Sequence, residues 1–61
     1  MKVGTLVSAS GMGTGIIVEK DERKSTNNLL VCWLTEDLFG YPPYTKTWED
    51  PRVLSILSDI E

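Results

Sequence analysis

The stretch Leu29-Leu30-Val31-Cys32-Trp33-Leu34 is a continuous run of six apolar residues. The polar and charged segment 21–28 precedes it without periodicity, and Gly40 and the pair Pro42-Pro43 follow it. An apolar run between polar or turn-forming segments is typical of a strand that is covered on both faces. The run therefore predicts a central β-strand and is the best candidate for the core.

Three further segments have the pattern of strands. β-Branched residues occupy every second position from 3 to 7, which predicts a strand at about residues 2–8. A β-branched run follows the glycines after it and predicts a second strand at about 14–20. Aromatic or long side chains alternate with threonines in 44–49, which predicts a fourth strand after the central one.

The last segment fits two structures. Asp50 as an N-cap and Pro51 at the first helical position would start a helix. The apolar positions 53, 54, 57 and 60 fit a helical stripe, whereas positions 53, 54, 56 and 57 fit a short turn followed by a strand equally well. We favour a 3₁₀ turn at about 51–53 and a final strand at about 54–58, because the four preceding strands need a closing partner for their edges.

Five short strands are thus expected in 61 residues, with a glycine turn after the first and a proline-containing turn before the last. The segments that carry the pattern are Val3-Gly4-Thr5-Leu6-Val7, Gly13-Thr14-Gly15-Ile16-Ile17-Val18, Leu29 to Leu34, and Thr47-Trp48-Glu49-Asp50-Pro51 leading into Val53-Leu54-Ser55-Ile56-Leu57. This arrangement resembles the Src homology 3-like small β-barrels of the KOW and Tudor kind. It is also similar to short bacteriophage proteins that share a late Trp-Glu-x-Pro turn. The resemblance implies an all-β fold, a partly open five-stranded barrel with a 3₁₀ turn before the last strand. It does not identify a ligand, because this architecture hosts unrelated functions.

The composition indicates a small, folded, soluble chain. Hydrophobic residues make up 41% and charged residues 25%, close to the globular average. A chain of 61 residues forms one small domain, expected to span residues 1–61. The sequence shows no signal-peptide pattern and no apolar stretch near the length of a membrane helix. We expect a cytoplasmic protein, in the host cytoplasm if a phage encodes it, with no membrane partner.

Catalysis, cofactors and metals are not expected. The chain has no histidine, which excludes imidazole chemistry, and Cys32 is its one cysteine, which excludes a multi-cysteine zinc site. Cys32 lies in an apolar run without a basic neighbour, as an inert core thiol does. Gly11, Gly13 and Gly15 lack the Lys-Ser/Thr pair of a phosphate-binding loop, so we interpret them as turn glycines. The prediction is a protein that is not an enzyme.

The charge balance disfavours a nucleic-acid partner. Six basic residues stand against nine acidic ones, a formal net charge of −3, and the basic residues are scattered. The nucleic-acid alternative would use Lys2, Lys46 and Arg52 as phosphate contacts, with Tyr41 or Tyr44 as a stacking platform. Strong salt dependence would be its signature.

Aromatic residues are concentrated in one part of the chain, because all five lie within residues 33–48. In a hairpin of the third and fourth strands, we expect Trp33 and Trp48 to lie near each other on one face, with the other aromatics on the loop. Aromatic surfaces are typical of protein interaction sites. The alternative is that at least one tryptophan fills the barrel and the tyrosines cover its end. The candidate protein-binding residues are Trp33, Glu36, Asp37, Phe39, Tyr41, Pro42, Pro43, Tyr44 and Trp48.

The apolar loop 38–44 would leave an exposed patch on a monomer unless a partner covers it. Our leading hypothesis is a non-enzymatic protein-interaction module, a small phage accessory or inhibitory protein. It would bind a protein partner, or itself as a homo-oligomer, through hairpin 36–48. A narrower version is an aromatic cage for methylated lysine or a groove for a proline-rich peptide, with Glu36 and Asp37 as counter-charges. The alternative remains a nucleic-acid-binding small barrel.

Overall fold

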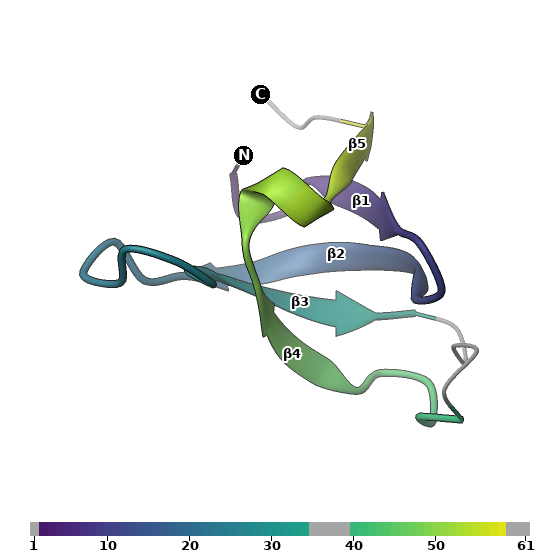
Figure 1. Ribbon diagram of the computed structural model, residues 1–61. Helices are drawn as coiled ribbons and strands as arrows, with labels where there is room; N and C mark the ends of the chain where they lie inside the picture. The colour runs from purple at the N-terminus through teal and green to yellow at the C-terminus, as the bar shows by residue number, and fades with distance from the viewer. Residues whose placement is uncertain (1, 35–39, 59–61) are drawn as a thin grey trace.

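The computed structural model describes residues 2–34 and 40–58, which form one open antiparallel sheet of five strands (Figure 1). The strand order is β4-β3-β2-β1-β5, so β4 and β5 are the edges of the sheet. Within the described residues, the one helical element is a 3₁₀ turn, η1. The predicted all-β class is therefore confirmed. The elements are β1 (Leu6–Ala9), β2 (Gly13–Lys20), β3 (Leu29–Trp33), β4 (Lys46–Glu49), η1 (Pro51–Val53) and β5 (Ser55–Ser58).

Strand β3 lies between β2 and β4, as the apolar run predicts. Its residues Leu29, Val31 and Trp33 are buried and point to the core face of the sheet. On the opposite face, Cys32 is buried and Leu30 is half-buried. Coverage of β3 is thus complete on the core face and partial on the outer one.

The core is assembled from three of the strands, β1, β2 and β3, and from the residue after η1. Its cluster of buried residues consists of Val7, Ile17, Leu29, Val31, Trp33 and Leu54. Gly15 lies inside β2 rather than in the turn that we expected for it. A Cβ atom at Gly15 would lie 2.5 Å from Val31 Cγ1 and 2.8 Å from Trp33 Cε3. The missing side chain therefore makes room for the Trp33 ring.

Strand β1 begins later than the alternation predicts. Gly4 has a φ of +97°, and the Thr5 amide donates to the Lys2 carbonyl at 3.0 Å. The first residues therefore form a turn, and regular pairing starts at Leu6. The alternation in 2–8 correctly indicates a buried Thr5 and Val7, but it cannot show that a glycine bends the chain before the strand starts.

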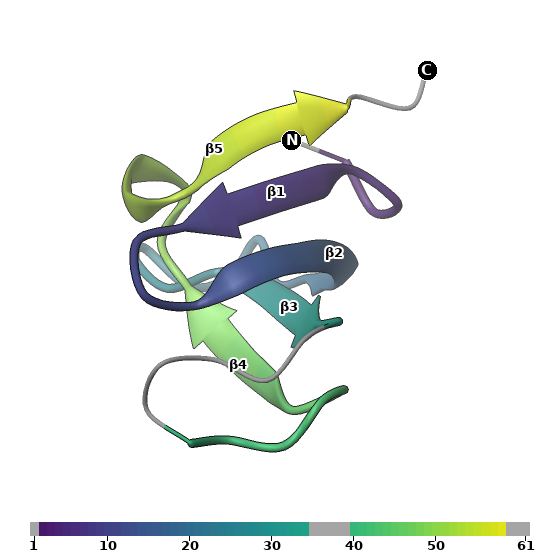
Figure 2. The same ribbon diagram turned by 90° about the vertical axis from the view of Figure 1, so that its right-hand side faces the viewer.

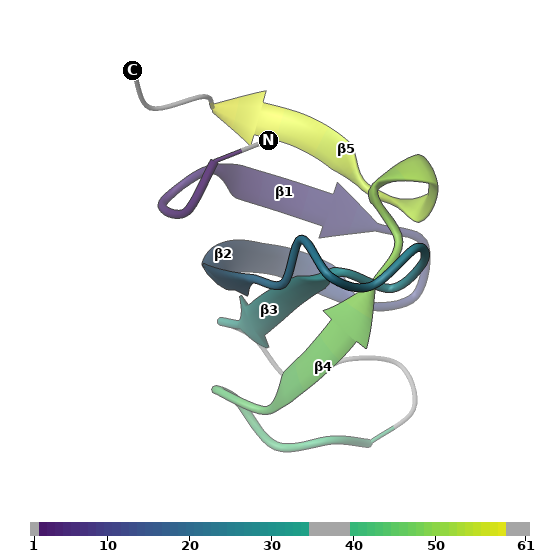
Figure 3. The same cartoon turned by 90° about the vertical axis from the view of Figure 1, so that its left-hand side faces the viewer.

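The segment after β4 adopts the turn and strand rather than the helix. The Asp50 side chain accepts the Arg52 amide at 2.9 Å and so caps η1 at Pro51–Val53. Strand β5 then pairs with β1 through Val7↔Ile56 and Ser8↔Ser55. Figures 2 and 3 show the β5–β1 pair and β4 at opposite ends of a strongly twisted sheet, with β2 and β3 between them.

Candidate protein-binding surface

The two tryptophans lie on opposite faces of the β3–β4 hairpin, which corrects the expectation that they share one face. Trp48 lies opposite Leu30 in the register, on the outer face. Trp33 lies with Val31 on the core face and is 1% exposed. Trp33 therefore fills the interior, as the alternative interpretation proposed, and its side chain is not available to a partner.

A chain of side-chain hydrogen bonds fixes Trp33 in the interior. Its indole Nε1–H donates to Thr47 Oγ1 at 2.7 Å, and the Thr47 hydroxyl donates to Glu49 Oε2 at 2.7 Å. Thr47 and Glu49 are alternate residues of β4 and lie on the same face as Trp33. The polar atom of the buried ring is thereby satisfied, and β4 is tied to β3 beyond its backbone ladder.

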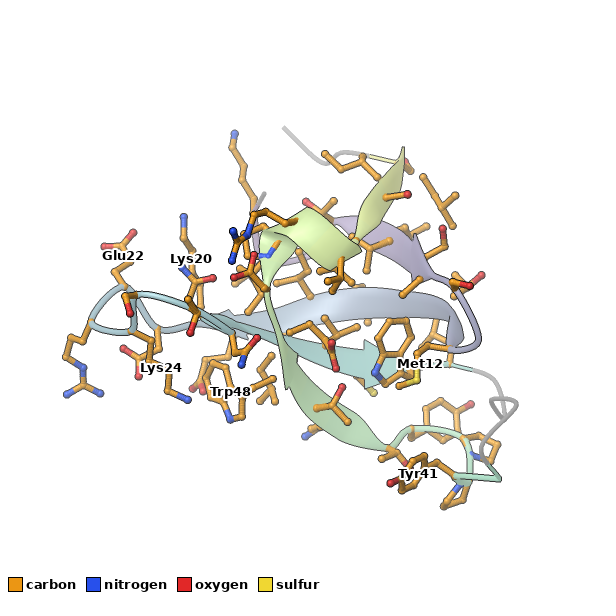
Figure 4. All side chains as sticks on the ribbon, viewed as in Figure 1. Met12, Lys20, Glu22, Lys24, Tyr41 and Trp48 are labelled. Atoms are coloured by element: carbon orange, nitrogen blue, oxygen red, sulfur yellow. The ribbon has the colours of Figure 1, made fainter. Side chains whose placement is uncertain are left out.

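Trp48 lies near the C-terminal end of β4, whereas the tyrosines lie before its N-terminal end. The Nζ atom of Lys24, from the β2–β3 loop, lies 3.7 Å from the centroid of its ring. Figure 4 shows Lys24 and Trp48 near the β2–β3 loop, whereas Tyr41 lies at the other end, beyond the start of β4. The half-buried Trp48 thus holds a loop of its own chain by a cation–π contact, and it is not continuous with the Tyr41–Tyr44 surface.

The exposed aromatic surface consists of residues 41–44, here called the tyrosine turn. Tyr41 is 52% exposed and Tyr44 69% exposed, and Pro42 and Pro43 between them are also exposed. Leu34, at the end of the neighbouring strand, is a further exposed apolar residue. The structure thus brings together four of the nine predicted site residues. The predicted site residues Glu36, Asp37 and Phe39 lie outside the described residues.

The backbone of Tyr44 has a conformation that large residues rarely adopt. Its φ is +67°, and it follows Pro43 in a turn that the Thr45 hydroxyl closes by donating to the Pro42 carbonyl at 2.7 Å. Proline followed by a residue of positive φ is the pattern of a type II turn, whose second central position favours glycine. The sequence offers no signal for this conformation, because a tyrosine is not expected there.

Two backbone hydrogen bonds hold the tyrosine turn against β3. The Tyr44 amide donates to the Trp33 carbonyl at 2.6 Å, and the Trp33 amide donates to the Thr45 carbonyl at 2.9 Å. Tyr44 and Thr45 therefore both lie opposite Trp33, as in a β-bulge whose first residue has a positive φ. The Cys32 thiol also lies 3.8 Å from the Tyr44 carbonyl oxygen, as a weak donor. The bulge explains why β4 starts at Lys46 and not at Tyr44.

The charged residues form local pairs away from the tyrosine turn. Asp21 accepts hydrogen bonds from the amide and guanidinium of Arg23, and Asp50 accepts the same set from Arg52. These bonds lower the pKa of both aspartates below the usual value. Arg52, one of the three cations of the nucleic-acid alternative, is thus already engaged with a carboxylate 3.1 Å away.

The described residues form neither a metal-ligand cluster nor an apolar ligand pocket of the usual kind. No group of three or more His, Cys, Asp or Glu side chains converges within residues 2–34 and 40–58. A shallow open concavity at the start of the β2–β3 loop is lined by Glu19, Lys20, Asp21, Glu22 and Arg23. Its charged walls give it a polar, solvated character, unlike the mostly apolar pockets that bind small ligands.

Comparisons with known proteins give no match: no family model, curated protein or solved structure resembles this chain closely enough to be recognised. None of the helical segments described here is long and apolar enough to cross a membrane.

Proposed function

We propose that the protein is a non-enzymatic interaction module that binds another protein through the tyrosine turn. The observation that carries the proposal is the exposure of Tyr41 and Tyr44, 52% and 69%, on either side of two exposed prolines. Exposed tyrosines supply large contact areas and lose little side-chain entropy on binding. Two exposed tyrosines on one turn are typical of the residues that form an interaction hot spot.

The net charge of the chain and the engagement of four of its six cations support a protein partner over a nucleic acid. Arg23 and Arg52 are paired with carboxylates, Lys20 lies 3.8 Å from Glu22, and Lys24 lies over Trp48. Phosphate binding requires cations that can be collected on one surface, and a net charge of −3 opposes it. A salt-sensitive partner that disappears on nuclease treatment would instead favour the nucleic-acid alternative.

The wider setting of the proposal rests on resemblance. The five-stranded antiparallel sheet is compatible with a small barrel-like fold. A small accessory or inhibitory protein is proposed on the pattern of the sequence alone, which resembles Src homology 3-like barrels and short bacteriophage proteins. The proposed cytoplasmic location rests on the single cysteine and on the absence of a signal-peptide pattern from the given sequence. Because this architecture carries unrelated functions, the proposed activity rests on the tyrosine turn and not on the fold.

Affinity capture with matched variants tests the proposal. The tagged chain would be incubated with a nuclease-treated extract of its source, and bound proteins would be quantified by mass spectrometry. The test variant is Tyr41→Ser with Tyr44→Ser. The control is Val53→Ser with Leu57→Ser, which removes two similarly exposed apolar side chains from η1 and β5.

A stoichiometric partner that is retained by the wild type and the control, and lost with the test variant, would support the proposal. Equal retention by both variants would contradict it. Loss of every bound protein after nuclease treatment would move the nucleic-acid alternative into first place.

A further inference from the structure

Tyr44 occupies a position where its side chain works against the stability of the fold. Its φ of +67° lies in the left-handed region, which a side chain with a Cβ atom disfavours and glycine accepts. With 69% of the residue exposed, the ring gains little burial in return. Backbone strain of this kind persists where neighbouring hydrogen bonds hold it, as they do here, and strained residues cluster at functional sites.

Hydrogen bonds on both sides of Tyr44 restrict its backbone. The bonds from Tyr44 to Trp33, from Trp33 to Thr45 and from Thr45 to Pro42 fix the backbone on both sides of it. The ring of Pro43 fixes the φ of the residue that immediately precedes Tyr44. A side chain presented on a fixed backbone loses little additional entropy when it binds, so the turn is organised before its partner arrives.

We infer that Tyr44 is the anchor residue of the interface, and that it enters a tyrosine-sized, largely apolar pocket on a different protein. This inference rests on the proposed function and goes beyond it, because it states which partner supplies the concave surface. The tyrosine turn lies just before β4 and exposes both of its tyrosines to solvent. The module is then the inserted partner and not the receptor.

Two observations on the described residues favour a different protein over a second copy as the receptor. The concavity at Glu19, Lys20, Asp21, Glu22 and Arg23 is lined by charged side chains, which do not match an aromatic ring. Self-association would also bring together two chains of net charge −3. An apolar pocket on a different protein would match the aromatic ring and would avoid the repulsion between two copies of the chain.

The test uses the strain itself. The Tyr44→Gly variant removes the ring and relieves the left-handed cost, so it is expected to melt at the same temperature as the wild type or higher. As a soluble competitor, it is expected to displace the captured partner from immobilised wild-type chain at least about 30-fold less well, the loss that defines a hot spot. Tyr44→Phe keeps the ring and is expected to compete within about tenfold of the wild type.

The outcomes separate this inference from the proposed function. If Tyr44→Gly competes like the wild type while Tyr41→Ser with Tyr44→Ser does not, the turn binds a partner but Tyr44 is not its anchor. If both variants compete fully, the proposed function fails as well. A lower melting temperature for Tyr44→Gly would overturn the strain argument. If light scattering of the purified chain shows a dimer that Tyr44→Gly dissociates, the receptor is a second copy and the claim of a different protein is wrong.

Discussion

The indole of Trp33 donates to the hydroxyl of Thr47 across 2.7 Å, and this bond joins the buried centre of the protein to its edge strand. The ring is 1% exposed, so water cannot replace Thr47 as the acceptor. We predict that Thr47→Val lowers the free energy of unfolding by about 1–3 kcal/mol, the cost of leaving a buried donor unpaired.

Urea unfolding followed by circular dichroism would measure this change. Thr47→Ser is the matched control, since it keeps the hydroxyl and loses only a methyl group. The expected order of stability is wild type, then Thr47→Ser, then Thr47→Val. A valine variant as stable as the wild type would show that the bond contributes nothing.

Gly15 should be intolerant of a side chain. An added Cβ would meet Val31 at 2.5 Å and Trp33 at 2.8 Å, so β2 and β3 would have to separate. We predict that Gly15→Ala destabilises the protein by about 1–3 kcal/mol through overpacking. The exposed neighbour Glu19→Ala, in the same strand, is expected to change stability by less than about 0.5 kcal/mol. Equal effects in a thermal melt would contradict this account of the core.

Acid should weaken the connection between β4 and β5. The bonds that Asp50 accepts from Arg52 lower the pKa of its carboxyl in the folded state. A lowered folded pKa means that this stabilisation is complete above the unfolded pKa, about 3.9, and is lost as the pH falls through the folded value.

Asp50→Asn keeps a capping side chain but cannot ionise. We predict that its stability falls less than that of the wild type between pH 6 and pH 2.5, as measured by urea unfolding at each pH. Parallel losses in the two proteins would show that Asp50 does not contribute to the acid response. Asp21, whose pKa Arg23 lowers in the same way, is expected to account for part of the remaining dependence.

The contact between Lys24 and Trp48 predicts a spectroscopic effect. Lys24→Met keeps an unbranched side chain and removes the charge that lies 3.7 Å from the ring centroid. We expect a loss of about 0.5–1 kcal/mol in stability and greater quenching of Trp48 fluorescence by acrylamide. Trp48→Phe isolates the signal of the buried Trp33, which should stay poorly quenched in both backgrounds. Unchanged quenching of Trp48 would mean that the loop does not cover it.

Local patterns in the sequence predict the strands well, because each pattern reports on the residues that form it. The apolar run at 29–34 predicts β3, and the need of the sheet edges for a closing partner favours the turn and β5 over a helix. The prediction that Trp33 and Trp48 share one face is wrong, because it depends on more than a local pattern. Their faces depend on the register between two strands, and the bulge at Tyr44 shifts that register by one residue.

The conformation of Tyr44 is beyond prediction from composition or periodicity. Turn propensities place glycine or asparagine at positive φ, and both are absent from 41–44. The position follows from long-range pairing with Trp33, which no local window contains. The sequence thus indicates which segment is apolar and exposed, whereas the structure identifies the one strained residue within it.

The claim that the tyrosine turn is the binding surface is tested most directly by mapping the interface on the protein itself. The ¹⁵N-labelled chain would be titrated with the purified captured partner, and amide shifts would be followed by nuclear magnetic resonance. We predict that the largest shifts fall on residues 40–46 and Leu34, with β5 and the β2–β3 loop unchanged. Shifts centred on β5 or on Lys24 and Trp48, with Tyr41 and Tyr44 unaffected, would contradict the account.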